Sequence, residues 1–479
     1  MSTYWYLPAI LLPAAGGTFA GLFFKNEKAV RVFCGTVTCL TSALAFLLIL
    51  SGTEGLLEVA RFSDRLVFCL DLTGPGRVFA SVSASLWPLT ALYAFEYMDG
   101  DPRFRSFYSF FTLSFGVTLG IALAGNLFTL YCFYEMLTLS TVPLVVHTHT
   151  KEASRAGRVY LAMSIGGAAF AFISLVYTVV SGPALPPSAV SRVFWLFGFF
   201  GFGVKAAVFP LHFWLPKAAA APTPVTALLH AAAVVNAGVF AILRLTYEVY
   251  GADLLAGTPA QAAALSFVLF TVVYGSFMAV REQHLKRRLA YSTVSNLAYM
   301  LFGVLLLTPA GLTAGLMHMV FHSVMKITAF FAIGAVNRHA GIEYLQDAEG
   351  LGRRMPVTMA CFTVSALALI GIPPFAGFVS KWYLLAAAAD AGTPLAFLGM
   401  GAVLLSALFT AFYTLVIVRK AFFPAPGAVP ARREAGVRML VPLVLLAFAS
   451  LACGLAGRYF YNVLAETVSG IPSGQWGGL

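Results

Sequence analysis

The chain has 479 residues, of which 60% are hydrophobic and only 10% are charged. Soluble domains carry roughly 25% charged residues, so this composition excludes a water-exposed globular protein and predicts an integral membrane protein. The net charge of +11 does not indicate nucleic-acid binding, because the basic residues stand in short clusters between apolar runs, where they favour membrane topology and contact with anionic lipid.

Apolar runs of spanning length follow one another along almost the whole chain, and a spanning helix needs about 20 residues. We therefore predict an all-α integral membrane protein with about 14 transmembrane helices. The predicted spans lie near residues 4–24, 29–50, 76–98, 106–124, 126–147, 156–180, 190–220, 223–248, 262–281, 289–307, 312–336, 356–389, 395–418 and 440–457.

The basic residues between these runs predict the orientation. Most of the 30 Lys and Arg residues fall in odd-numbered connections, such as the cluster Arg281, Lys286, Arg287 and Arg288. Because basic connections stay in the cytoplasm, we expect both termini on the external side of a multi-pass protein in the cell inner (plasma) membrane. The basic residues of all connections, including Arg244 of the even-numbered set and Arg288 of the odd-numbered set, are interpreted as topology and lipid anchors.

Four charged residues lie deep inside predicted spans rather than near their ends, and each costs roughly 2.5 to 3.5 kcal/mol at the bilayer centre. Glu135 lies in the fifth span, Lys205 in the seventh, Lys326 in the eleventh and Lys381 in the twelfth. Glu135 is either a protonated acid that hydrogen-bonds another helix or part of a functional ion pair or proton carrier. We favour the functional interpretation, because a chain that avoids charge elsewhere has kept it at this depth.

Prolines interrupt the seventh span close to Lys205. Pro210 and Pro216 remove two backbone donors from the helix, and transporters use helices broken at membrane depth to build ion sites. A simple proline kink is the alternative. The lysine one turn before the break favours a functional site.

Histidines extend this pattern in the eighth and eleventh spans. The imidazole of His230 can accept and release a proton, because its ordinary pKa is about 6.5, although a lone membrane histidine is more often a packing residue. His318, His322 and Lys326 are spaced by four, which places them on one face of a helix. This column is a proton relay, a metal site or structural packing, and the relay is favoured because the span holds no carboxylate or cysteine to complete a metal site.

The twelfth span repeats the features of the seventh, because Pro373 and Pro374 interrupt it shortly before Lys381. The two breaks lie five spans apart, and an odd offset reverses the direction of the chain. Spans four to eight and nine to thirteen are therefore predicted to form inverted repeats. The predicted organisation is residues 1–105 for the first three spans, 106–250 for the first repeat, 251–420 for the second repeat, and 421–479 for the last helix and tail.

Four stretches carry a resemblance to a known family. They read KAAVFPLHFWLPKAAAAPTPVTALLHA, LKRRLAYSTVSNLAYMLFG, HMVFHSVMKITAFFAIGAV and GIPPFAGFVSKWYLL. They resemble the antiporter-like, proton-translocating membrane subunits shared by respiratory complex I, Mrp Na+/H+ antiporters and membrane-bound hydrogenases. The resemblance covers most of residues 100–420 and implies fourteen core helices, inverted five-helix repeats and a proton channel at mid-membrane depth. By position it assigns to the proton relay Glu135, Lys205, His230, His318, His322, Lys326 and Lys381.

Two positions depart from the pattern of that family. Asn236, which cannot titrate, stands where many relatives carry a lysine, so His230 is expected to carry the central proton transfer. His284 stands where an aspartate often begins the connection between the ninth and tenth spans. Because Lys381 replaces the glutamate of some relatives, the resemblance favours a protein like the D-type component of Mrp antiporters, or an equivalent hydrogenase or oxidoreductase subunit.

The predicted function is proton translocation through this Glu/Lys/His relay, coupled to redox chemistry or cation antiport in partner subunits. The implied partners are other membrane subunits of such an assembly, the lipid bilayer, and H+, with Na+ as a further candidate ion. We expect no catalytic centre, cofactor or metal in the chain itself, because the six cysteines show no ligand spacing and no nucleotide motif occurs. The alternatives are a free-standing secondary cation/H+ or solute transporter, a membrane enzyme and a structural spacer.

Overall fold

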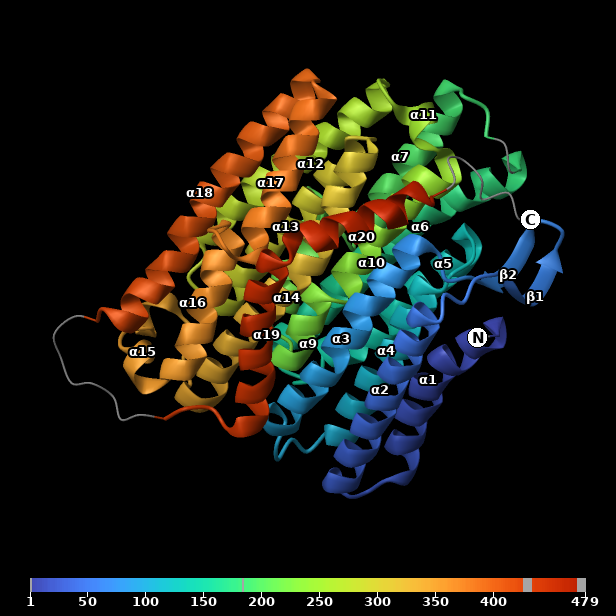
Figure 1. The fold of residues 1–479 in the computed structure, drawn as a ribbon. Helices are drawn as coiled ribbons and strands as arrows, with labels where there is room; N and C mark the ends of the chain where they lie inside the picture. Colours follow the sequence, from blue (N-terminus) through green and yellow to red (C-terminus); the bar gives the residue numbers. More distant parts are fainter. Residues whose placement is uncertain (1, 183–184, 425–432, 472–479) are drawn as a thin grey trace.

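The computed structural model describes residues 2–182, 185–424 and 433–471, which are mostly α-helical (Figure 1). The first helices are α1 (Tyr6–Phe23), α2 (Glu27–Leu50), α3 (Gly74–Tyr97), α4 (Phe104–Ala122), α5 (Leu127–Val145) and α6 (Lys151–Ser181). The middle of the chain forms α7 (Ala189–Gly203), α8 (Trp214–Ala218), α9 (Thr223–Ala231), α10 (Val234–Arg244), the π-helical turn η3 (Leu245–Tyr250) and α11 (Ala252–Leu255). The remaining helices are α12 (Pro259–Arg281), α13 (Leu285–Leu305), α14 (Pro309–Ala340), α15 (Leu351–Arg354), α16 (Pro356–Ile370), α17 (Ala376–Ala391), α18 (Pro394–Phe422), α19 (Val437–Leu455) and α20 (Gly457–Ser469). Short 3-10 turns are η1 (Thr3–Trp5), η2 (Leu211–Phe213) and η4 (Leu345–Asp347).

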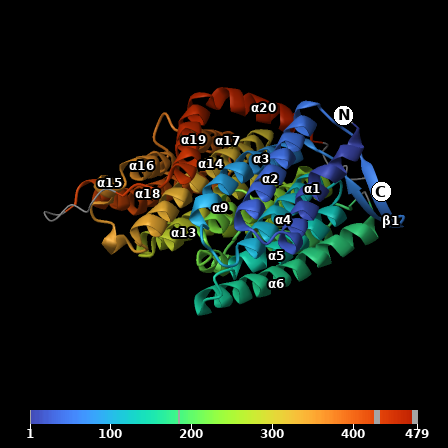
Figure 2. The ribbon, with the colours of Figure 1, turned by 90° about the horizontal axis from the view of Figure 1, so that it is seen from below.

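Ten helices in the described residues are long and apolar enough to cross a membrane. This finding supports a multi-pass helical membrane protein, whereas the count of 14 spans stays a prediction. Figures 1 and 2 show α14 inside the bundle; α18 runs along the left edge in Figure 1, and α6 runs along the lower edge in Figure 2. Accordingly α14 is almost completely buried, while α6 and α18 expose apolar side chains such as Phe170 and Phe412.

Threonine followed by proline begins three long helices. The side chains of Thr258, Thr308 and Thr393 each accept a hydrogen bond from the backbone three residues later, and a proline occupies the first helical position. The hydroxyl satisfies one free N–H of the first turn, and proline tolerates that position because its N–H is not needed there. These pairs therefore fix where α12, α14 and α18 begin.

A β-hairpin, absent from the all-helical prediction, interrupts the connection between α2 and α3. Strand β1 (Leu57–Ser63) pairs antiparallel with β2 (Leu66–Leu70), and Leu70 forms a bridge with Ala124 after α4. The apolar run of β2 is only five residues long, too short to span a membrane but sufficient for a strand. We call the end of the bundle with the hairpin the hairpin face, and the end with residues 98–103, 146–150 and 217–222 the opposite face.

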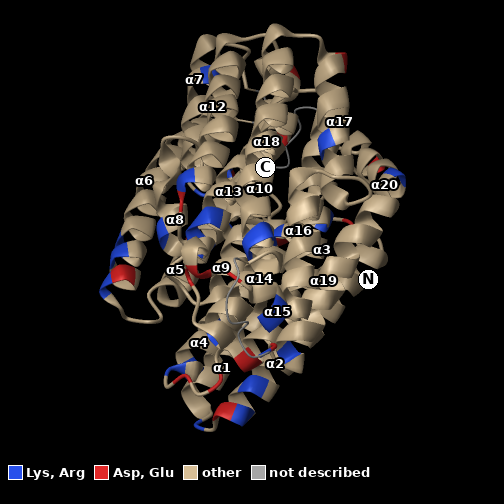
Figure 3. Ribbon diagram, turned by 90° about the vertical axis from the view of Figure 1, so that its left-hand side faces the viewer, with Lys and Arg blue, Asp and Glu red and all other residues tan. Residues whose placement is uncertain are grey.

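Charged residues colour only a small part of the ribbon in Figure 3, and clusters of them lie at the ends of α2 and α6 that belong to the opposite face. Several predicted spans are divided. Helix α7 ends at Gly203 and α8 begins at Trp214, while α16 ends at Ile370 and α17 begins at Ala376. Residues 232–233 also separate α9 from α10, a division that no proline marks in the sequence.

Candidate functional site

Lys205 follows the end of α7 and is completely buried. Its ammonium donates a hydrogen bond to the backbone carbonyl of Tyr134 on α5 and lies over the Tyr134 ring, 3.3 Å from the ring centroid. Helix α10 approaches this segment at Gly238, where a Cβ atom would overlap the backbone nitrogen of Ala206. The missing side chain therefore allows α10 to pack directly against the chain beside Lys205.

Glu135 is the residue after Tyr134, but the structure does not join it to Lys205. No ion pair within 4.0 Å connects the two side chains in the described residues, and the Oε1 atom of Glu135 is buried without a hydrogen-bond partner. The ammonium of Lys205 instead contacts the backbone carbonyl and the aromatic ring of Tyr134. The two side chains are therefore not held together by a direct ion pair.

His230 lies on α9 and is completely buried, with its ring 4.9 Å from that of Phe330 on α14. Neither of its ring nitrogens has a hydrogen-bond partner in the described residues. Nearby, Asn236 on α10 donates from Nδ2 to the carbonyl of Ala231 at 2.8 Å and to Ser323 Oγ on α14 at 2.9 Å. The amide of Asn236 therefore links α10, beside His230, to α14, which carries His318, His322 and Lys326.

The column His318, His322 and Lys326 on α14 is completely buried, and the two imidazole rings stand 6.1 Å apart. Lys326 Nζ donates to Ser292 Oγ at 2.7 Å and to the Leu289 carbonyl at 3.3 Å, both on α13. Its partners are thus uncharged oxygen atoms.

Both ring nitrogens of His318 are hydrogen-bonded. Nε2 is 3.2 Å from Asn296 Oδ1 on α13, and Nδ1 is 2.9 Å from Ser380 Oγ on α17. Because a carbonyl oxygen only accepts, Nε2 carries the proton in the neutral ring and Nδ1 accepts from the serine hydroxyl. His318 therefore links the predicted column to the residue beside Lys381.

Lys381 lies on α17 and is 6% exposed. Its ammonium donates to the carbonyls of Leu369 at 2.6 Å and Ile370 at 2.9 Å, which are the last residues of α16. These carbonyls lack helical partners because α16 ends there, at Gly371 with a φ of +96°. The end of one helix thus supplies the partners of the lysine on the next.

One face of α13 holds this second group together, and sequence reasoning missed it. Ser292, Asn296 and Tyr299 are spaced by four and three residues, so they share a helix face. They contact Lys326, His318 and the neighbourhood of Lys381, whose Nζ lies 5.4 Å from the centroid of the Tyr299 ring. The available signal was the group of polar residues Ser292, Thr293, Ser295 and Asn296 inside a predicted span.

Buried charge also occurs where the sequence indicated topology anchors. Arg244, at the end of α10, pairs its Nε with Glu248 Oε2 at 2.6 Å, and both side chains are at most 3% exposed. Arg288 on α13 is buried as well and donates to the carbonyls of Tyr413 and Glu282. Interpreting these arginines as lipid anchors was wrong, because their helix faces turn inward rather than toward lipid or solvent.

The structure resembles solved membrane proteins over nearly its whole length. A chain of the membrane-bound sulfane sulfur reductase, an archaeal respiratory membrane complex, superimposes with a TM-score of 0.86 at 25% identity, covering 98% of both chains. A chain of the Mrp complex from Dietzia sp. DQ12-45-1b gives a TM-score of 0.87 at 22% identity, again with 98% of both chains covered. At 22% identity, the likeness to the Mrp-complex chain shows a shared fold and nothing further.

Sequence comparison gives relatives with known names. The NADH-quinone oxidoreductase subunit N of Desulforudis audaxviator is 33% identical over 78% of this chain and 79% of its own length. A component of the probable K(+)/H(+) antiporter of Rhizobium meliloti is 30% identical over 93% of this chain. That protein is longer, and the match covers only 46% of its length. The family model described as NADH:quinone oxidoreductase/Mrp antiporter, TM matches residues 124–410, more than half of the chain. The chain therefore belongs to the NADH:quinone oxidoreductase/Mrp antiporter family of membrane proteins.

Proposed function

We propose that this chain is an antiporter-like subunit of a multisubunit membrane complex and that it translocates protons through the buried row from Glu135 to Lys381. The main support is that the three buried lysines are hydrogen-bonded only to uncharged oxygen atoms among the described residues. Lys205 donates to one backbone carbonyl, Lys326 to a hydroxyl and a carbonyl, and Lys381 to two carbonyls. Buried charges are expensive and usually serve a function. Because no carboxylate neutralises these ammonium groups within 4.0 Å in the described residues, each can lose and regain a proton without breaking an ion pair.

The first step concerns Glu135 and Lys205. The carboxylate favours the protonated lysine through space, and a charge change in a neighbouring membrane protein of the complex pulls the carboxylate away. Lys205 then releases its proton toward His230. Since Lys205 is bonded to Tyr134, next to Glu135 on the same helix, a small movement of α5 changes both interactions together.

The second step crosses from α9 and α10 to α14. The ring nitrogens of His230 and His322 and the Oδ1 atom of Asn236 are buried and have no partner in the described residues. Buried polar atoms of this kind are commonly satisfied by ordered water. Water at this junction connects His230 to the column on α14, and the proton continues through Lys326 and His318 toward Lys381.

We further propose the predicted repeats, residues 106–250 and 251–420, and an orientation with the hairpin face outside the cell. In support of the repeats, a lysine accompanies each divided segment, Lys205 after α7 and Lys381 after α16.

The related proteins named above include components of a quinone oxidoreductase and of a cation/proton antiporter. By analogy, partner subunits supply redox energy or a cation gradient, with Na+ as a further candidate ion.

The test is proton pumping by the native complex, purified with its co-purifying subunits and sealed in vesicles. Lys205→Ala and Glu135→Gln are expected to reduce pumping to the rate of the passive leak, because each removes a titratable group of the row. Lys28→Gln removes an exposed lysine and is expected to pump normally. Pumping by Lys205→Ala at the wild-type rate overturns the proposal, and cation transport by the purified chain alone would indicate a free-standing transporter.

A further inference from the structure

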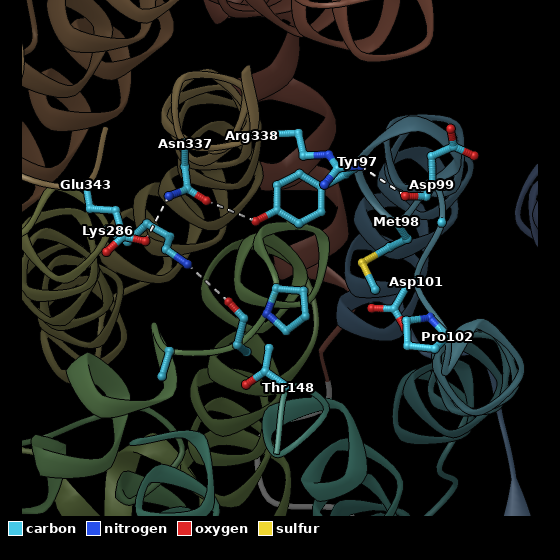
Figure 4. A pocket seen from close by; sticks show the side chains of 14 residues that line it. Tyr97, Met98, Asp99, Asp101, Pro102, Thr148, Lys286, Asn337, Arg338 and Glu343 are labelled. Carbon is cyan, nitrogen blue, oxygen red and sulfur yellow. Dashed lines mark hydrogen bonds between the residues drawn. The ribbon is translucent and has the colours of Figure 1, made fainter. Parts of the chain in front are cut away.

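A cavity of about 540 Å³ opens on the opposite face, between segments far apart in the sequence (Figure 4). The connection between α3 and α4 contributes Asp99 and Asp101, and the chain before α9 contributes Ala221. Lys286 comes from the first turn of α13, and Glu343 from the segment after α14. The cavity therefore lies where the helices of both predicted repeats meet the N-terminal helices.

Lys286 differs from the basic residues beside it. Arg287 forms an exposed ion pair with Glu152, and Arg288 donates to three backbone carbonyls. Lys286 is only 8% exposed, lines the cavity and donates to the carbonyl of Ala221 at 3.2 Å. No carboxylate lies within 4.0 Å of its ammonium in the described part of the chain. A buried ammonium at a cavity, with no described carboxylate that close, needs an explanation beyond topology.

The carbonyl that holds Lys286 also holds a residue of α9. Thr226 Oγ donates to the Ala221 carbonyl at 3.0 Å, and its side chain is completely buried. His230 follows Thr226 by four residues, so it lies on the same face of α9, about 6 Å further along the axis. Lys286 and Thr226 therefore share one acceptor, about one helical turn from a histidine whose nitrogens have no partner in the described residues.

A second set of hydrogen bonds joins the rim of the cavity to the start of α9. Asn337 donates to Glu343 Oε1 at 2.9 Å and accepts from the Tyr97 hydroxyl at 3.4 Å. The Tyr97 hydroxyl in turn accepts from Thr223, the first residue of α9, at 3.2 Å. Figure 4 shows Asn337 between Tyr97 and Glu343. This network fixes an acidic side chain at the mouth relative to the helix that carries His230.

We propose that this cavity is the port through which His230 exchanges protons with solvent on the opposite face, with Lys286 as the carrier and Thr226 as the connecting hydroxyl. An N–H bond of the Lys286 ammonium breaks and its proton passes to a cavity water, leaving a neutral lysine. The water passes a proton to the Thr226 oxygen while the Thr226 O–H proton moves through a second water to a ring nitrogen of His230. Lys286 then regains a proton from cavity water near Asp99, Asp101 and Glu343. The reverse order serves release, and neither direction involves oxidation or reduction. This inference rests on the proposed function.

The test uses the native complex in sealed vesicles, with Lys205→Ala prepared in parallel. Lys286→Met removes the carrier, and Lys286→Arg keeps the charge but cannot release a proton, because arginine stays protonated in proteins. Both are expected to slow pumping by about tenfold or more, as for other proton-transfer groups. Thr226→Val, which removes only the hydroxyl, is expected to slow pumping in the same direction. The matched control is Arg287→Gln, which removes the neighbouring positive charge and is expected to pump at the wild-type rate.

Chemical rescue separates a carrier from a structural residue. In Lys286→Cys, an aminoethyl thiol reagent applied at the opposite face rebuilds an ammonium of nearly lysine length, whereas an ethyl reagent does not. Recovery of pumping with the first reagent alone supports the port, and failure of both reagents overturns it. Normal pumping by Lys286→Arg also overturns it, because a fixed charge would then be enough. If Lys205→Ala is inactive while all Lys286 variants pump normally, the port is wrong and the proposed function stands.

Discussion

His284 shows how one substitution within a family motif acquires a physical meaning from its position. It occupies the N-cap of α13, where its side chain makes no capping hydrogen bond. Burial lowers the pKa of its imidazole, and the charges of Lys286 and Arg287 lower it further. An aspartate, expected here from the family resemblance, would accept a hydrogen bond from the first turn and interact favourably with the helix dipole.

We therefore predict that His284→Asp stabilises the protein by about 1 kcal/mol at neutral pH. In the wild-type protein the unfolded histidine, with its ordinary pKa of about 6.5, binds more protons than the folded one below that pH. The free energy of unfolding therefore does not depend on His284 above pH about 6.5, and it decreases as the pH falls below that value. In His284→Asp this decrease should be smaller, because the histidine is absent. Thermal melting in detergent across this range measures both effects. Identical melting curves for the two proteins at every pH would contradict the prediction.

At the level of elements, the eighth predicted span is the clearest departure from a simple membrane helix. The sequence predicts one continuous helix over 223–248, whereas the structure contains α9, α10 and the π-helical turn η3. The Arg244 and Glu248 pair lies at the junction of α10 and η3, and Arg244 also donates to the Ala124 carbonyl beside the hairpin. The pair thus joins this helix to the segment that precedes α5.

We predict that Glu248→Ala destabilises the protein by about 3 to 5 kcal/mol, because it removes one partner of a buried ion pair. The measurement is the melting temperature of the purified protein in detergent. Glu58→Ala is the matched control, since the ion pair of Glu58 with Arg61 is exposed to solvent and its loss should leave the melting temperature nearly unchanged. A melting temperature for Glu248→Ala equal to that of Glu58→Ala would show that the buried pair contributes nothing.

For the whole molecule, the distribution of basic residues predicts that the hairpin face is external. Asp64, in the exposed turn of the hairpin, and Lys28, at the exposed start of α2, lie on the two faces. A membrane-impermeant maleimide should therefore label Asp64→Cys in intact cells, and should label Lys28→Cys only after the membrane is opened. Wild-type protein gives the background from its native cysteines. The opposite labelling pattern would reverse the orientation and place the Lys286 cavity outside.

The resemblance to the family followed from sequence motifs, and comparison confirmed it. The hairpin and the division between α9 and α10 did not follow, because neither carries a local signal as strong as a long apolar run or a proline. The predicted relay residues are buried or half-buried, yet their roles stay a prediction. Their partners Tyr134, Ser292 and Ser380 were missed because each comes from a helix distant in sequence, and its contact depends on how that helix is rotated.

That this is a membrane protein with a few charges at spanning depth followed from the amino-acid sequence, because the cost of desolvating a charge makes such residues conspicuous in an apolar chain. Which basic residues are buried depended on the packing of the helices. Lys286 and Arg287 are neighbours with the same charge, yet one lines a cavity and the other pairs with an exposed acid. Composition does not distinguish them, because successive residues of a helix point about 100° apart and packing decides which direction is the interior.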